Sequence, residues 1–109
     1  MSKSNIYKHL DRLGYPASCT GTDYIATAIT ICLADRDARM CKDIYPGIAA
    51  ATGKTWASIE RAMRTATDAA MRSPVWTAAW REIGGVNEPT NSEVCHRIAR
   101  EIREEECTL

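Results

Sequence analysis

Apolar residues recur every three or four positions through most of the chain, which is the spacing of one face of an α-helix. The clearest stripe runs through residues 23–35 and predicts the main core helix. Further stripes predict helices over residues 4–13, 40–52 and 56–71. Runs of alternating apolar and polar residues, which are typical of strands, are few. The pattern therefore predicts an all-α fold.

Glycine and proline divide the chain into about six helices in a single domain over residues 1–109. Gly14 is a stop signal for the first helix, and residues 15–22 form a polar connector before the second. Pro46 lies inside the third segment, so we expect that helix to start late or to kink there. Gly53 then ends it.

Capping signals place the last two helices. Ser73 and Pro74 combine a cap residue with a proline at the first helical position. The helix that follows is expected to bury Trp76, Trp80 and Ile83 before Gly84 ends it. Thr90 and Glu93 have capping-box spacing and predict the start of a helix that reaches about Glu105. Its apolar stripe consists of Val94, Ile98 and Ile102.

The formal net charge is zero, which argues against a protein that coats nucleic acid by charge alone. No apolar run approaches the ~20 residues that span a bilayer, and the first residues do not resemble a signal peptide. We therefore expect a cytoplasmic protein without a membrane partner.

The five cysteines are scattered and form no Cys-x-x-Cys pair, so neither a metal site nor a disulfide scaffold is expected. Cys32 and Cys95 are interpreted as small core residues, and Cys19 and Cys107 as free thiols. His9 and His96 each stand alone. Because no phosphate-binding loop, nucleophile–base arrangement or ligand set is found, we expect no enzyme, no cofactor and no small-molecule substrate.

Residues 48–59 have the spacing of a helix-turn-helix. Ala49 is small where two helices must cross, Gly53 suits a turn that needs a positive φ, and Ile59 is placed to enter the core. All three spacings agree, so a helix-turn-helix over roughly residues 48–72 is the leading interpretation.

The outward face of the second of these helices decides whether it reads DNA. Arg61, Arg64, Thr65, Asp68 and Arg72 share one face. Arg61 and Arg64 suit bidentate bonds to guanine, and Glu60 suits a bond from cytosine. At the helix start, backbone N–H groups and the helix dipole favour phosphate beside Lys54, Thr55 and Ser58. The alternative for this face is an amphipathic helix whose charged side is only solvated.

Three strings together resemble the DNA-binding effector domain of the stage-zero sporulation response regulator of Firmicutes. They are residues 44–49 (Ile-Tyr-Pro-Gly-Ile-Ala), 59–64 (Ile-Glu-Arg-Ala-Met-Arg) and 89–93 (Pro-Thr-Asn-Ser-Glu). Residues 13–17 and 21–24 also match, and the resemblance covers residues 9–105.

The resemblance implies a six-helix domain that binds a short asymmetric DNA box, often as tandem copies. It places Glu60, Arg61 and Arg64 at recognition positions. It also implies contacts of the last helix with a neighbouring copy, for which the stripe Val94, Ile98 and Ile102 is the candidate, and contacts of residues 70–83 with the sigma subunit of RNA polymerase.

The chain also departs from that family. Ser58 and Thr65 stand where arginine and histidine are usual, and Asn87 and Glu88 replace lysines. The region with Pro74, Trp76 and Trp80 is rewritten, so weaker binding or a shifted DNA site is expected. Met1–Lys8 supplies nothing like the family's phosphate-accepting receiver domain, so the chain is expected to be either an excised effector domain or a free-standing relative. Met1, Ser2 and Lys3 resemble a native start, which favours the free-standing relative.

Sequence-specific binding of double-stranded DNA and transcriptional regulation is the leading functional hypothesis. The alternative is a protein-interaction module, an antagonist or dimerisation partner of a related regulator. Zero net charge and the acidic segment 101–106 favour that alternative.

Overall fold

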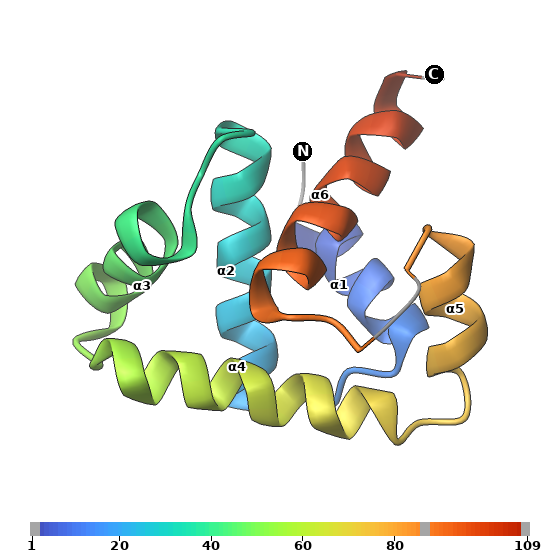
Figure 1. Cartoon of the computed structure of the whole chain (residues 1–109), viewed down its shortest axis with the longest axis horizontal. Helices are drawn as coiled ribbons and strands as arrows, with labels where there is room; N and C mark the ends of the chain where they lie inside the picture. Colours follow the sequence, from blue (N-terminus) through green and yellow to red (C-terminus); the bar gives the residue numbers. More distant parts are fainter. Residues whose placement is uncertain (1–2, 86–87, 108–109) are drawn as a thin grey trace.

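Helices account for the regular secondary structure of the described chain (Figure 1). The computed structural model describes residues 3–85 and 88–107. The elements are α1 (Lys3–Leu13), α2 (Thr20–Ala34), the π-helical turn η1 (Met40–Ile44), α3 (Tyr45–Thr52), α4 (Trp56–Met71), α5 (Trp76–Glu82) and α6 (Asn91–Cys107). No strand occurs within these described ranges, so the all-α prediction is confirmed.

Helix α2 is the centre of the fold and packs against α1, α3, α4, α6 and η1. Its inward residues Ile25, Ala28, Ile29 and Cys32 are at most 1% exposed, which confirms the predicted core helix. In Figure 1 α2 rises from the middle of α4 and ends far from it. The two ends of α2 therefore lie at different surfaces of the molecule, the first beside α4 and the second far from it (Figure 1).

The start of α2 corrects the sequence-based boundary. The sequence predicts that residues 20–22 belong to the connector, but the helix already begins at Thr20. Gly21, which resembles a loop residue, lies inside the first turn, and a Cβ atom there would lie 1.9 Å from the carbonyl oxygen of Ala62 in α4. Gly21 therefore does not mark a turn. It allows the backbones of α2 and α4 to lie in close contact.

The predicted helix over residues 40–52 is divided in two. Its first part is η1, in which the Ile44 N–H donates to the Arg39 carbonyl at 3.0 Å, a π-helical i to i+5 bond. The α-helix itself starts late, at Tyr45, with Pro46 in its first turn, where the missing N–H costs nothing. The expected effect of Pro46 is confirmed.

Helix α5 begins at Trp76, two residues after the proline. Residues 73–75 form a turn in which the Ser73 Oγ accepts a hydrogen bond from the Val75 N–H at 3.4 Å. Trp76 and Trp80 are buried and stacked, with ring centroids 5.1 Å apart, whereas Ile83 is only partly buried. The Ser-Pro signal therefore marks a turn before the helix rather than its first residues.

Helix α6 starts with the predicted capping box: the Glu93 N–H donates to the Thr90 Oγ1 at 3.1 Å, and the Thr90 N–H donates to the Glu93 Oε1 at 3.2 Å. The buried stripe of α6 corrects another expectation. Val94, Ile98 and Ile102 are 0% exposed, because they pack into the core of their own chain. The interpretation of these three side chains as contacts with a second copy is therefore wrong.

Two long-range contacts hold the C-terminal half of α6. The buried His9 of α1 lies 2.7 Å from a carboxylate oxygen of Glu105. The Arg103 guanidinium donates to the carbonyl of Cys32 near the end of α2. Cys32 and Cys95 are buried core residues, as predicted.

Candidate nucleic-acid interface

Helices α3 and α4 are joined by a three-residue turn, residues 53–55. Gly53 has φ 74°, and its N–H donates to the Ala49 carbonyl at 2.8 Å, which is a left-handed helix cap. A Cβ atom at Gly53 would meet nothing within 4 Å, so space does not require glycine there. The backbone conformation alone favours it.

The start of α4 is capped by a side chain. Thr55 is the N-cap, and its Oγ1 accepts a hydrogen bond from the Ser58 N–H at 3.2 Å. Within the same turn the Lys54 N–H donates to the Thr52 Oγ1 at 3.2 Å. The side chains of Lys54, Thr55 and Ser58 are exposed and lie together at this end of α4.

The inward side of α4 places the helix on the core. Ile59 and Met63 are 0% exposed, and Ala49 of α3 is partly buried against the core. The Thr67 hydroxyl lies 2.8 Å from the phenol oxygen of buried Tyr15, which adds a polar link between α4 and the segment after α1. The orientation of α4 therefore depends on contacts along most of its length.

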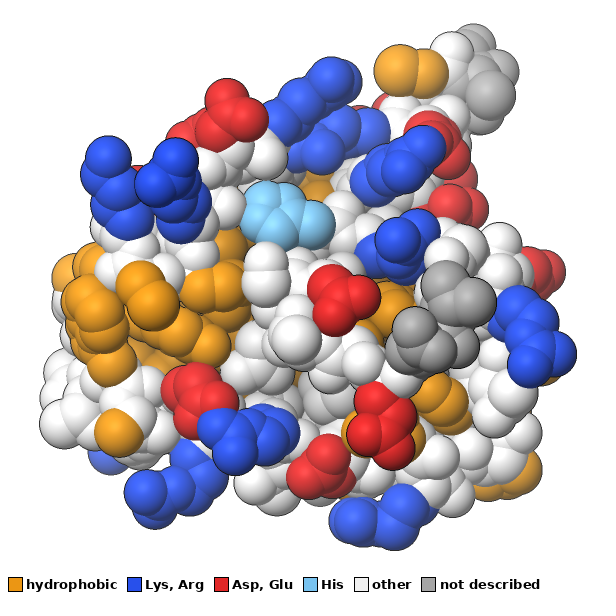
Figure 2. Space-filling model, in the orientation of Figure 1, with side chains coloured by type: hydrophobic (Ala, Val, Ile, Leu, Met, Phe, Trp, Pro, Cys, Tyr) orange, Lys and Arg blue, Asp and Glu red, His pale blue; other side chains and the backbone are white. Residues whose placement is uncertain are grey.

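The outward side of α4 carries a row of exposed polar residues at intervals of four, three and four: Arg61, Thr65, Asp68 and Arg72. Arg64 is exposed beside this row. Basic and acidic side chains both occur along the edge of the molecule that α4 forms (Figure 2). The face is thus polar and mixed in charge, with arginine as its main basic residue.

Glu60 and Arg64 form an ion pair one turn apart, so these two predicted base-reading residues contact each other. Glu60 lies on the flank of α4 toward α6, where the Asn91 side chain donates to the Glu60 carbonyl and to the Tyr45 hydroxyl, both at 3.3 Å. The carboxylate neutralises part of the arginine charge on this face. Glutamate and arginine four residues apart lie on the same side of a helix, which allows this pair.

Arg61 has a different environment. It makes no ion pair within the described residues, and it lines a shallow hollow with Thr20 and Gly21 of α2 and with Ser58 and Thr65 of α4. The first turn of α2 thus lies beside the exposed face of α4. Arg61 and Arg72 are thus the exposed arginines of this face that form no ion pair among the described residues.

Trp56 is a residue of this surface that the sequence analysis missed. It is 46% exposed at the first position of α4, and its ring lies 6.4 Å from that of Tyr45. The spacing gave no signal of this exposure, because Trp56 lies three residues before Ile59 and continues the three- and four-residue spacing of the buried stripe Ile59, Met63, Ala66 and Ala70. An exposed tryptophan next to Lys54 and Thr55 extends the candidate surface.

Other types of site find no support in the part of the chain that the structure describes. That part holds no group of three or more histidine, cysteine or acidic side chains able to bind a metal. None of its helices has the length and apolar character needed to cross a membrane. Of the two residues that stand where the family has lysines, Glu88 is exposed, and Asn87 lies outside the described residues.

Comparison with known protein families identifies this chain's relatives. Residues 6–102 match the family model described as the C-terminal domain of the sporulation initiation factor Spo0A. The matched region includes α2, η1, α3, α4 and α5 entirely, and most of α1 and α6. It therefore contains the helix-turn-helix and every residue proposed above for its exposed face.

Proposed function

Because the chain belongs to the family of Spo0A C-terminal domains, which are regulatory DNA-binding effector domains, we propose that it binds double-stranded DNA sequence-specifically through α4. The observation that carries the proposal is the exposed row Arg61, Thr65, Asp68 and Arg72 on a helix that follows a tight glycine turn. A helix of this kind fits the major groove, where base edges are distinguishable.

The roles divide between positioning and base reading. Lys54, Thr55 and Ser58 lie at the start of α4, where their side chains and the helix N-terminus bind phosphate and set the register. Arg61 and Arg64 donate to guanine, with Thr65 and Arg72 farther along the same face. Arg61 is the principal reader, since it forms no ion pair among the described residues and lies in the first half of α4, whereas Arg72 is the C-cap of that helix.

Glu60 tunes this reading. In the free protein its carboxylate binds Arg64. In the major groove the pair separates, so that Glu60 accepts from the amino group of cytosine while Arg64 donates to guanine. The pair therefore makes Arg64 less available to sequences that do not offer both partners.

The family resemblance also implies contacts with other proteins. We propose that copies bound at tandem sites contact each other through exposed residues of α6, since its apolar stripe is buried. Contact with the sigma subunit of RNA polymerase is assigned to the exposed side of residues 70–83, where Val75 is 46% exposed.

Selection of bound duplexes from a random DNA pool, at fixed near-physiological salt, tests the proposal. We expect an enriched asymmetric motif, and loss of enrichment at one position of that motif with Arg61→Ala. If the wild-type chain enriches no motif, sequence-specific binding is wrong.

The alternative, a protein-interaction module that antagonises a related regulator, is favoured by zero net charge and by the exposed acidic residues 104–106. Native mass spectrometry with and without duplex DNA separates the two. A stable dimer that forms without DNA and covers Arg61 and Arg64 supports the alternative, and a DNA complex of the chain supports the leading proposal.

A further inference from the structure

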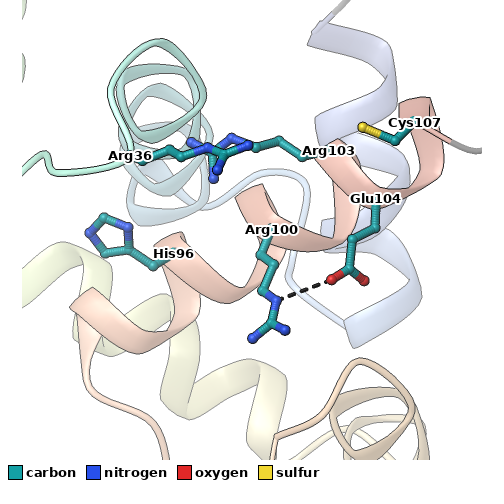
Figure 3. A pocket seen from close by; sticks show the side chains of 6 residues that line it. All are labelled: Arg36, His96, Arg100, Arg103, Glu104 and Cys107. Carbon is teal, nitrogen blue, oxygen red and sulfur yellow. Dashed lines mark hydrogen bonds and ion pairs between the residues drawn. The ribbon is translucent and has the colours of Figure 1, made fainter.

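A second concentration of basic side chains lies at the end of α2 that is remote from α4. A hollow of about 730 Å³ opens there between the residues that follow α2 and the exposed side of α6. Its lining consists of Arg36, His96, Arg100, Arg103, Glu104 and Cys107 (Figure 3). Figure 2 also shows basic side chains gathered on this part of the surface.

Two elements supply the basic groups. His96, Arg100, Arg103 and Cys107 follow one another at intervals of four, three and four, so they share one face of α6. Arg36 comes from the segment after α2, on the other side of the hollow. The side chains of Arg36 and Arg103 extend from these two elements toward each other in Figure 3.

The charges of this hollow are not balanced by its own residues. The carboxylate of Glu104 binds Arg100, with the two atoms 3.1 Å apart. The Arg103 guanidinium donates to the Cys32 carbonyl, a neutral acceptor. Arg36 forms no ion pair within residues 3–85 and 88–107. Three arginines against one carboxylate leave two positive charges.

An anion between Arg36 and Arg103 would relieve their mutual repulsion. Guanidinium groups donate in a planar fork that matches phosphate oxygens, and a phosphate dianion matches the two uncompensated charges. The volume of the hollow lies in the range of small-molecule pockets and is larger than the volume of a single phosphate. A ligand that fills the hollow therefore carries an organic part as well as a phosphate.

We propose that this hollow binds a phosphorylated small molecule of about nucleotide size, with its phosphate held between Arg36 and Arg103 and with Arg100 at its edge. The site lies at the opposite end of α2 from the surface assigned to DNA, so the two ligands do not compete for residues. It is independent of the DNA-binding proposal and stands or falls separately.

Titration of the ¹⁵N-labelled chain, followed by amide chemical shifts, tests the site. The probes are inorganic phosphate, pyrophosphate and ATP without magnesium, each at constant ionic strength. We expect saturable shifts at residues 36, 96, 100 and 103, with half-saturation at a concentration about tenfold lower for ATP than for inorganic phosphate, as expected for added contacts. Shifts restricted to α4, or no saturation with any probe, would overturn the proposal.

Arg36→Ala and Arg39→Ala form a matched pair, because both arginines are exposed in the same segment and only Arg36 lines the hollow. We expect Arg36→Ala to weaken ATP binding about tenfold, the effect of losing a charged hydrogen-bond donor, and Arg39→Ala to leave it unchanged. Equal weakening by both variants would indicate non-specific attraction and reject the site. Saturable binding of a hexaglutamate peptide at these residues, without binding of ATP, would reject it in favour of a protein partner.

Discussion

Gly21 of α2 lies directly against the backbone of Ala62 in α4, so that a Cβ atom at Gly21 would lie 1.9 Å from the Ala62 carbonyl oxygen. Ala62 is the residue after Arg61, whose side chain points outward from the same turn. The contact therefore couples the packing of the core to the position of the proposed reading residue. A side chain at position 21 has to displace a helix backbone.

Gly21→Ala should lower the free energy of unfolding by about 2 kcal/mol or more, since overpacking against a backbone atom cannot be relieved by a rotamer change. Urea denaturation measures the effect. Gly47→Ala is the matched control, because Gly47 is also helical and its added Cβ would meet only the Ile31 Cδ1 at 3.1 Å. Equal stability of the two variants would contradict the close helix contact.

Arg61→Ala and Lys54→Ala should affect DNA binding differently. Loss of Arg61 should cost roughly 1–3 kcal/mol on the selected site and relax specificity at one base pair. Loss of Lys54 should weaken selected and random duplexes alike and reduce the slope of log affinity against log salt by about 1. Fluorescence anisotropy over a salt series measures both. An Arg61→Ala variant that binds its selected site normally would remove Arg61 from the reading role.

Glu60→Gln should release Arg64 from its ion pair and remove a negative charge from the DNA-facing side. We expect random-sequence duplex to bind about twofold to fivefold more tightly at low salt, which corresponds to about 0.5–1 kcal/mol. The control is Glu82→Gln, an exposed acidic residue of α5. If Glu82→Gln has the same effect, total charge and not the Glu60–Arg64 pair governs the affinity.

Trp56 should report DNA binding by its fluorescence. It is 46% exposed at the start of α4, whereas Trp76 and Trp80 are 6% and 4% exposed. Duplex DNA should therefore quench or shift the emission of Trp56 and leave that of the two buried rings unchanged. The Trp56→Phe variant should lose the response. A response that persists in that variant would place the perturbed tryptophan near α5.

The five thiols should divide by burial when the folded chain reacts with an aromatic disulfide reagent. Cys41 and Cys107 are exposed and should react first, whereas Cys32 and Cys95 are buried and should react only on unfolding. Burial raises the pKa of Cys32 to about 11, with the charge of Arg103 opposing the shift, and raises the pKa of Cys95 well above its usual value. Rapid reaction of all five thiols would contradict this core.

Cys32 should also contribute to the dependence of stability on alkaline pH. The pKa of Cys32 rises from 9.0 to about 11 in the folded chain, so the unfolded chain loses its proton first. The contribution of Cys32 to the free energy of unfolding is therefore complete below pH 9 and declines as pH rises toward 11. Urea denaturation of the wild type and of Cys32→Ala between pH 8 and about 10.5 should show a steeper decline for the wild type.

Local features of this chain were readable from residue spacing. The Thr90–Glu93 capping box, the late start of α3 beside Pro46 and the apolar stripe of α2 each depend on residues within about two helical turns. Side chains at such distances meet whenever the helix forms, because helix geometry is constant. The strings that resemble the sporulation regulator family are also local, and two of them lie in the helix-turn-helix. They therefore indicated the DNA-binding function without knowledge of the tertiary structure.

Features that depend on distant segments required the folded chain. Spacing shows that Val94, Ile98 and Ile102 share one face of a helix, but it does not show what covers that face. In the folded chain this face of α6 packs into the core of the same molecule. Gly21 resembles a loop residue until α4 lies against it. Arg36 and Arg103 line the same hollow only because α2 and α6 pack side by side. Periodicity specifies a helix and its faces, whereas the partner of each face is chosen by packing between segments far apart in sequence.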